Sequence, residues 1–247
     1  MSKSISLGAT RAKDDVDQSS AAYDDATKLL EEVVNRFKTG NENEQQDERI
    51  ESLITKLIAM KTTYDPMESL YGPMYCSLYM YTPGATDKKA SQPLWEKLSL
   101  KKDNLKGQQY FCNENEFNVS KRRNVINYAE IYGNTFHITA RGYFVPVDPQ
   151  QNNAEILDSP IGGTRNCPDK YEVSANGAAF SLFNKSITLP IEGSSYLVVG
   201  YADPRLRIFI SPKPSDSIVG EWESAGLIVV QVRSDLVTKD GNSIELS

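Results

Sequence analysis

From Met74 onward the chain alternates short runs of β-forming residues with turn signals, and no helical periodicity interrupts the series. Dipeptides such as Pro83-Gly84, Gly133-Asn134 and Asn176-Gly177 separate the runs, as Gly, Pro and Asn do in turns. Strands that follow one another without crossover helices form an antiparallel sheet, which closes into a barrel or folds into a sandwich. We expect strands at about 74–81, 108–112, 116–119, 123–131, 134–145, 171–174, 178–183, 186–191, 195–201, 206–211 and 226–233.

Two amphipathic helices are predicted before these strands. Apolar residues recur at helical spacing over 21–38, between a cap at Ser19 or Ser20 and a stop at Gly40, and again over 47–61. Because the polar faces are rich in acids, docking on the protein's own sheet is favoured over a lipid surface.

Three regions follow from this organisation. Residues 1–20 form a flexible N-terminal segment, 21–64 the helical hairpin packed on the barrel, and 65–247 the β-barrel domain. Within that domain, the long, polar, Pro- and Gly-rich stretch 146–170 predicts a loop insertion at the barrel mouth or a contact with a partner.

Charge is distributed unevenly along the chain. The net charge of -6 argues against a general nucleic-acid binder, and residues 1–65 carry 13 acidic and 9 basic residues. Residues 88–123 carry nine basic and four acidic residues, which suits solvated loops, anionic lipid headgroups or an acidic protein surface. The residues of this patch expected to meet a membrane or partner are Lys88, Lys89, Lys101, Lys102, Lys121, Arg122 and Arg123.

Cysteine spacing and hydropathy indicate the redox state of the protein's compartment and the kind of membrane contact to expect. Cys76, Cys112 and Cys167 are too widely spaced for a zinc site or a dense disulfide framework, which favours a reducing compartment. No run approaches the ~18 consecutive apolar residues of a membrane-spanning helix, so we expect any membrane contact to be peripheral. The start, MSKSISLGATRAKDD, lacks the apolar core of a secretory signal, and we expect that a longer targeting peptide has been removed.

Catalytic constellations are nearly absent from the sequence. His137, the single histidine, rules out a multi-histidine metal centre, and its run NTFHITARGYF is typical of a half-buried strand. No GxSxG elbow, phosphate-binding loop or CxxC pair occurs, so we expect no catalytic or metal-binding residues and no enzymatic activity. An enzyme with His137 or a carboxylate as its base is the weaker alternative.

The segment SYLVVGYADPRLRIFISP, residues 194–211, predicts a β-hairpin. Pro204 pushes Asp203 out of the helical region, and Asp readily starts a turn. The alternation of the second arm does not say which face points inward, so its arginines either orient a ligand's polar end or belong to a docking surface. The two faces are Leu206, Ile208 and Ile210 on one side and Arg205, Arg207 and Phe209 on the other.

The run YADPRLRIFISP resembles the C-terminal signature of the plastid lipid-associated proteins, also called plastid fibrillins, in which a Tyr-x-Asp-x-x-Leu-Arg-Ile strand precedes a final apolar strand. GLIVVQVR supplies that last strand, and the helices ATKLLEEVVNRFKTG and RIESLITKLIAM are similar to the family's N-terminal portion. The usual first-strand Trp is replaced around Met74 and Tyr75. The signature residues that match are Tyr201, Asp203, Leu206, Arg207 and Ile208.

The resemblance implies a lipocalin-like β-barrel in a plastid (chloroplast), at thylakoids or lipid globules, that binds a carotenoid, chlorophyll, quinone or lipid and is not an enzyme. An alternative is a peripheral subunit of a photosynthetic membrane complex such as a photosystem or antenna, with a barrel packed by its own side chains. The residues expected to line a ligand site are Tyr79, Tyr81, Phe136, Ile138, Phe144, Tyr201, Leu206, Arg207 and Ile208.

Overall fold

A computed structural model describes residues 8–40, 43–60, 62, 64, 66–83, 106–111, 123–131, 136–146, 170–182, 185–190, 192–212 and 225–237. The long helices are α1 (Gly8–Thr39) and α2 (Glu44–Met60), and the short ones are α3 (Pro66–Ser69) and α5 (Ser234–Val237). The strands are β1 (Tyr75–Tyr81), β2 (Lys106–Phe111), β3 (Arg123–Ile131), β4 (Phe136–Pro146), β5 (Lys170–Leu182), β6 (Lys185–Leu189), β7 (Gly193–Ala202), β8 (Leu206–Pro212) and β9 (Ala225–Arg233).

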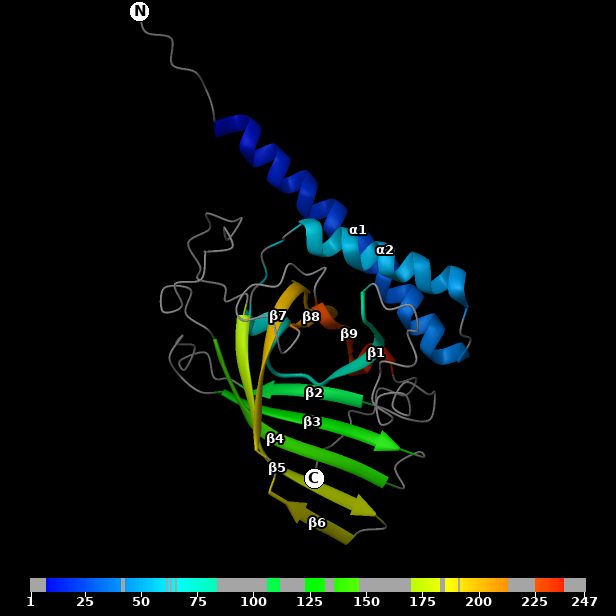
Figure 1. Cartoon of the computed structure of the whole chain (residues 1–247). Helices are drawn as coiled ribbons and strands as arrows, with labels where there is room; N and C mark the ends of the chain where they lie inside the picture. Colours follow the sequence, from blue (N-terminus) through cyan, green and yellow to red (C-terminus); the bar gives the residue numbers. More distant parts are fainter. Residues whose placement is uncertain are drawn as a thin grey trace, which may run out of the picture.

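The strands pair antiparallel in the order β4-β3-β2-β1-β9-β8-β7-β5-β6, and a further pairing of β4 with β5 closes eight of them into a ring. The helical hairpin of α1 and α2 lies against one side of this ring (Figure 1). The predicted fold class is therefore confirmed: a mainly β, antiparallel lipocalin-like barrel preceded by a helical hairpin. No helix in the described part of the chain is long and apolar enough to cross a membrane.

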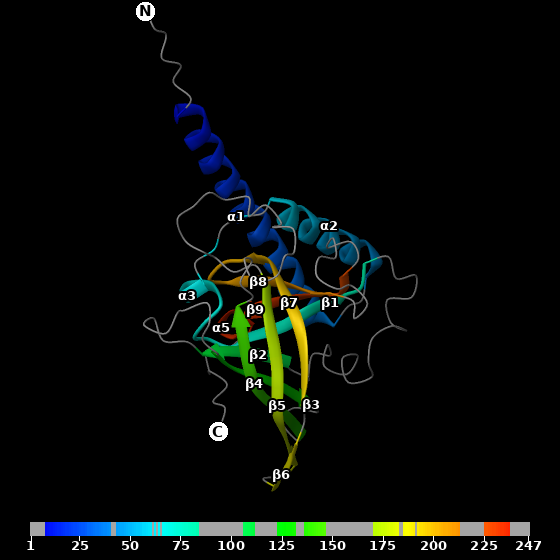
Figure 2. The same cartoon turned by 60° about the vertical axis from the view of Figure 1, so that its left-hand side comes forward.

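The ring is not uniform around its circumference. β1 pairs with β2 through two residue pairs, Tyr75 with Gln108 and Cys76 with Gly107. β5 pairs with β7 through its first half and with β6 through its second half, while β4 follows β5 along its whole length. The first half of β4 and the second half of β5 therefore project from the ring together with β6, at the end away from α1 and α2 (Figures 1 and 2).

Two expectations about element boundaries are wrong. α1 begins at Gly8, so the predicted cap at Ser19 or Ser20 lies inside the helix, which extends into the segment expected to be flexible. Asn176-Gly177 is not a turn, because β5 runs unbroken from Lys170 to Leu182 and the dipeptide lies beside a register shift opposite Arg141 and Gly142. The predicted strand 116–119 and the stretch 147–169 of the predicted loop lie outside the described residues.

Gly142 makes this register shift sterically possible. A Cβ atom at Gly142 would lie 1.9 Å from the backbone oxygen of Ser174 on the neighbouring strand. No other residue type fits so close an approach of two backbones. The bulge is therefore tied to one position of β4.

The two faces of the strand wall form two separate cores. Outward-facing residues of β1, β7, β8 and β9 pack with the apolar stripes of α1 and α2 into one buried cluster. Inward-facing residues form a second cluster inside the barrel. The outer cluster includes Leu29, Ile50, Ile54, Leu57, Leu206, Ile208, Ile210, Ile228 and Val230, and the inner one Leu70, Tyr71, Val125, Phe144, Tyr171, Val199 and Phe209.

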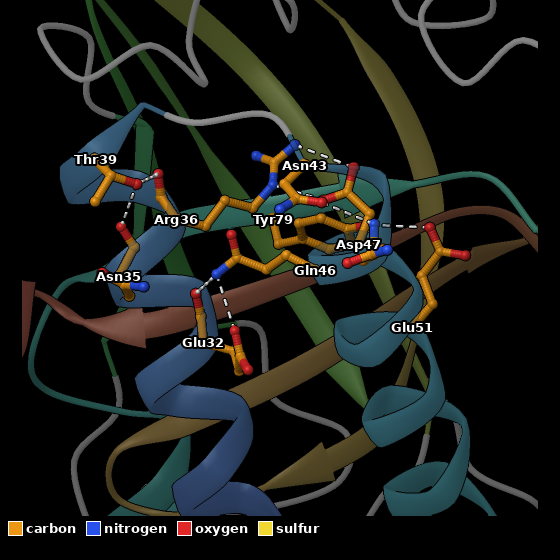
Figure 3. Close-up of polar contacts among 10 residues, drawn as sticks. Glu32, Asn35, Arg36, Thr39, Asn43, Gln46, Asp47, Glu51 and Tyr79 are labelled. Carbon is orange, nitrogen blue, oxygen red and sulfur yellow. Dashed lines mark hydrogen bonds and ion pairs between the residues drawn. The ribbon is translucent and has the colours of Figure 1, made fainter.

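Polar contacts fix the hairpin on the barrel. The Tyr79 hydroxyl donates a hydrogen bond of 2.9 Å to Glu51 of α2, and the Arg36 guanidinium of α1 lies 5.1 Å from the centre of the Tyr79 ring. Tyr79 of β1 thus contacts both helices (Figure 3). Arg36 also pairs with Asp47 at 2.7 Å, which joins α1 to α2. The missing side chain of Gly200 leaves room for α2, because a Cβ there would lie 3.0 Å from Ile58.

Candidate functional site

Among the residues whose side chains the structure describes, Arg207 on β8 is the one charged side chain that is fully buried inside the barrel. Its Nε donates to the Gln231 side-chain oxygen at 2.6 Å, and its Nη1 donates to the backbone oxygen of Leu70 at 3.0 Å. Gln231 in turn donates to the Ser77 hydroxyl at 3.2 Å. Hydrogen bonds to a charged group are stronger than those between neutral groups, so this chain holds the guanidinium in one orientation.

Tyr75 lies beside this arginine. Its ring centre is 4.0 Å from the Arg207 guanidinium carbon, and its hydroxyl donates to the backbone oxygen of Pro204 at 3.2 Å. Burial raises the pKa of Tyr75, while the charge of Arg207 opposes that rise. The pair is thus a neutral phenol stacked on a cation, with an aromatic wall and a positive centre in the same place.

Aromatic rings line the interior next to this centre. Phe144 lies between Tyr71 and Tyr171, with ring centres 5.6 and 5.5 Å apart respectively. The hydroxyls of Tyr171 and Tyr64 are 3.5 Å apart. Rings at these separations contact one another at their edges and faces, so packed aromatic side chains line this part of the interior.

Small side chains occupy the middle of the same interior face. Ala140 pairs with Ala178, and Gly142 pairs with Ala175, one step toward the aromatic rings. Ala129 on β3 lies beside Ile138 and is buried. These small residues lie on adjacent strands and occupy less volume than the larger side chains that fill a packed barrel.

The interior face continues beyond the ring over β4, β5 and β6. Ile138 pairs with Phe180 and Phe180 with Ile187, so side chains on three strands form one row. Ile187 is 65% exposed and Leu182 is 46% exposed. We call this surface the β4–β6 apolar face; its residues are Phe136, Ile138, Phe180, Leu182, Ile187 and Leu189.

The structure divides the residues expected to line a ligand site. Arg207 and Phe144 lie inside the barrel, and Phe136 and Ile138 lie on the β4–β6 apolar face. The other five face outward into the core shared with the helical hairpin, and are Tyr79, Tyr81, Tyr201, Leu206 and Ile208. Helix packing thus accounts for the burial of these five.

Burial also changes the acidity of the outward tyrosines. It raises the pKa of Tyr81 to about 12, with the nearby Glu51 carboxylate adding to the rise. Burial and the acidic neighbours of Tyr79 and Tyr201 raise the pKa of both phenols as well. All three remain neutral hydrogen-bonding groups over the physiological range.

The turn between β7 and β8 joins the barrel to α1. Asp203 accepts hydrogen bonds from the backbone N–H groups of Arg205 and Leu206 at 2.7 and 2.8 Å, which closes the turn. Arg205 pairs with Asp203 at 2.7 Å, donates to Thr27 at 2.9 Å and stacks on Tyr23 at 3.9 Å. Arg205 therefore serves helix docking and does not share the inward face of Arg207.

The predicted basic patch cannot be placed as a surface. Arg123 begins β3. The others lie outside the described residues and are Lys88, Lys89, Lys101, Lys102, Lys121 and Arg122.

The described residues bring together no group of three His, Cys, Asp or Glu side chains that could hold a metal ion. His137 on β4 stacks against Tyr128 at 5.9 Å and is half-buried. Cys76 on β1 is buried in the outer core, and β2 and β3 lie between the two strands in the sheet. An open groove of about 1000 Å³ lies on the helical hairpin, lined by polar residues such as Glu32, Gln46 and Arg49.

Sequence reasoning missed part of the interior polar chain. Period-two alternation predicts Tyr75 on one face with Tyr79 and Tyr81, but the register shift between Ser77 and Tyr79 puts Tyr75 on the face of Arg207. Ser77 and Gln231 were not assigned a role, although Gln231 is the one polar residue in the apolar run GLIVVQV. A lone polar residue inside an apolar strand requires a buried partner. That signal would have pointed to Arg207, which pairs with Gln231 across β8 and β9.

Together these features define an eight-strand antiparallel barrel whose interior combines an aromatic wall, small residues and one buried cation. Comparison of the chain with models of protein families, with curated proteins and with solved structures gives no match.

Proposed function

We propose that this protein binds an apolar small molecule inside the barrel and does not catalyse a reaction. The observation that carries the proposal is the set of small side chains facing the interior between the aromatic rings and Phe136. Burial of a ligand's apolar surface there favours binding by about 25 cal/mol per Å². The stacked pair of Arg207 and Tyr75 suits a polar group at one end of such a ligand.

The resemblance of YADPRLRIFISP to the plastid lipid-associated proteins supports a carotenoid, quinone or lipid as the ligand and a plastid as the location. The alternative is a barrel packed by its own side chains that acts as a peripheral subunit of a photosynthetic membrane complex. The two proposals differ in whether the interior has room for a guest.

Ala178→Phe tests for that room, because the new ring would project into the proposed ligand space. We expect the variant to lose uptake of a fluorescent fatty-acid analogue while its unfolding free energy changes by less than about 1 kcal/mol. Ala179→Phe is the matched control, since Ala179 is the next residue on β5 and faces outward. Uptake is measured by fluorescence titration and stability by urea unfolding.

A packed interior predicts the opposite result. Ala178→Phe would then cost about 1–3 kcal/mol through overpacking. The wild-type protein would take up no analogue, and organic extraction followed by mass spectrometry would recover no apolar compound. That outcome refutes ligand binding in the barrel and leaves the subunit alternative.

A further inference from the structure

The β4–β6 apolar face is confined to one side of the projecting strands. On the opposite side of β5 and β6, the Ser181 and Ser186 hydroxyls are joined at 3.2 Å, and Thr188 is exposed there. Ile187 and Leu189 on the apolar side are 65% and 41% exposed. A contiguous apolar surface of this kind marks an interaction site.

Charge is balanced at this end of the molecule. Residues 170–192 contain two basic and two acidic residues and so carry no net charge. Residues 21–60 of the helical hairpin, at the opposite end (Figures 1 and 2), contain nine acidic and five basic residues. Two copies of the chain therefore repel one another when their hairpins approach, but not when their β4–β6 ends approach.

Two exposed charges mark the ends of the face. Lys185 pairs with Leu182 across β5 and β6, so it lies on the apolar side, at the tip. Glu192 follows the other end of β6 and is also exposed. Neither forms an ion pair with another residue in the described part of the chain. An apolar face with a cation at one end and an anion at the other is complementary to a second copy turned by 180°.

From this pattern we propose that the β4–β6 apolar face binds a second copy of the chain about a two-fold axis, an interaction separate from binding of a small molecule in the barrel. The row of Phe180 and Ile187 packs on the same row of the second copy, as in two sheets packed face to face. The two β6 strands run antiparallel across the interface, so the Lys185 end of each copy lies over the Glu192 end of the other.

The edge of β6 argues against pairing through the backbone instead. β6 has five residues, begins at Lys185 and is followed by Pro190, which has no N–H to donate. A short edge bounded by Lys and Pro is the usual protection against strand addition. The two copies thus meet through the side chains of the face and not through the backbone of its edge.

The size of the face predicts a weak dimer. Its six apolar residues are fewer than the roughly 20–30 residues that each side of a standard interface contributes. We therefore expect a reversible dimer with a Kd of about 10–100 µM.

The first test is sedimentation velocity of the full chain at concentrations that span this Kd. Ile187→Glu should raise the Kd by about tenfold or more, since it removes an apolar contact and brings two negative charges together at the centre of the interface. Thr188→Glu adds the same charge to the next residue, on the opposite side, and we expect a change below about threefold.

Reversal of the two end charges tests the two-fold arrangement. Lys185→Glu leaves both ends of the face acidic, and Glu192→Lys leaves both ends basic. Each variant alone should therefore dimerise about tenfold more weakly than the wild-type chain. A mixture of the two variants should recover a Kd within about threefold of the wild-type value, because each copy then meets opposite charges at both ends.

Three results would overturn the proposal. These are a chain that stays monomeric at the highest concentration, equal losses in Ile187→Glu and Thr188→Glu, and a mixture that dimerises no better than either charge variant alone. A monomeric chain that floats with phosphatidylcholine vesicles, and loses this with Ile187→Glu, would show that a lipid surface covers the face instead. Uptake of the fatty-acid analogue reports on the barrel interior. Because Ile187→Glu leaves Ala178 unchanged, the two proposals can fail separately.

Discussion

The Tyr79 hydroxyl is a single group on which the contact of barrel and hairpin depends. Tyr79→Phe removes its hydrogen bond to Glu51, and we expect the free energy of unfolding to fall by about 1.5–3 kcal/mol because the acceptor is a carboxylate in a partly buried site. Tyr196→Phe is the control: Tyr196 is 45% exposed, and its ring contact with Lys170 survives the change. Urea unfolding of both variants gives the comparison, and equal stabilities would contradict the assigned role.

The buried tyrosines also predict how stability depends on pH. An unfolded tyrosine ionises near pH 10, whereas burial raises the pKa of Tyr81 to about 12 in the folded chain. Their contribution is therefore complete below about pH 10 and is lost as the pH rises from there toward 12. Urea midpoints should fall over that window, and Tyr81→Phe should flatten the fall; a slope unchanged by this substitution would assign the alkaline transition to other groups.

Individual residues also show where sequence reasoning stopped. Alternation correctly separated Arg207 and Phe209 from Leu206 and Ile208, but it does not say which of the two faces points into the barrel. The helices decide this, because the apolar residues of α1 and α2 cover the outward face of the strands. Arg205 was placed with Arg207 because the strand was extended into the turn, where Asp203 instead directs it to α1.

At the scale of elements, the register of β4 against β5 depends on Gly142. Gly142→Ala should destabilise the protein by more than about 2 kcal/mol, since its Cβ would overlap the Ser174 backbone and force the bulge to shift. Gly177→Ala, beside the same bulge, has no atom within 4 Å of a new Cβ and should change stability by less than about 1 kcal/mol. Thermal unfolding followed by circular dichroism distinguishes them, and equal midpoints would rule out the steric constraint.

Elements were the best predicted level of the structure. β3, β8 and β9 lie within two residues of the expected ranges, because period-two alternation bounded by turn residues identifies strands well. The prediction divided β5 in two because Asn-Gly is a strong turn signal. A β-bulge that contains the same dipeptide has no sequence pattern that distinguishes it from a turn. The start of α1 was missed because a serine in a polar stretch looks like a cap.

At the scale of the whole molecule, one apolar core joins the hairpin to the barrel. Ile54→Ala on α2 should lower the unfolding free energy by about 2–5 kcal/mol, because the side chain is fully buried in that core. Ser52→Ala, on the exposed side of α2, is the control. We expect the helical far-UV signal and the tyrosine near-UV signal to be lost in one transition. A hairpin that melts before the barrel would contradict a shared core.

Among the described residues, β1 and β2 are joined through two residue pairs, whereas β3 and β4 are joined through nine. Of the described strand pairings, this one has the fewest ladder contacts, so the ligand proposed above would have an entrance between β1 and β2 that leaves every other strand pairing intact. A barrel built in this way would admit a ligand through its wall, between two strands, and not only through its open end.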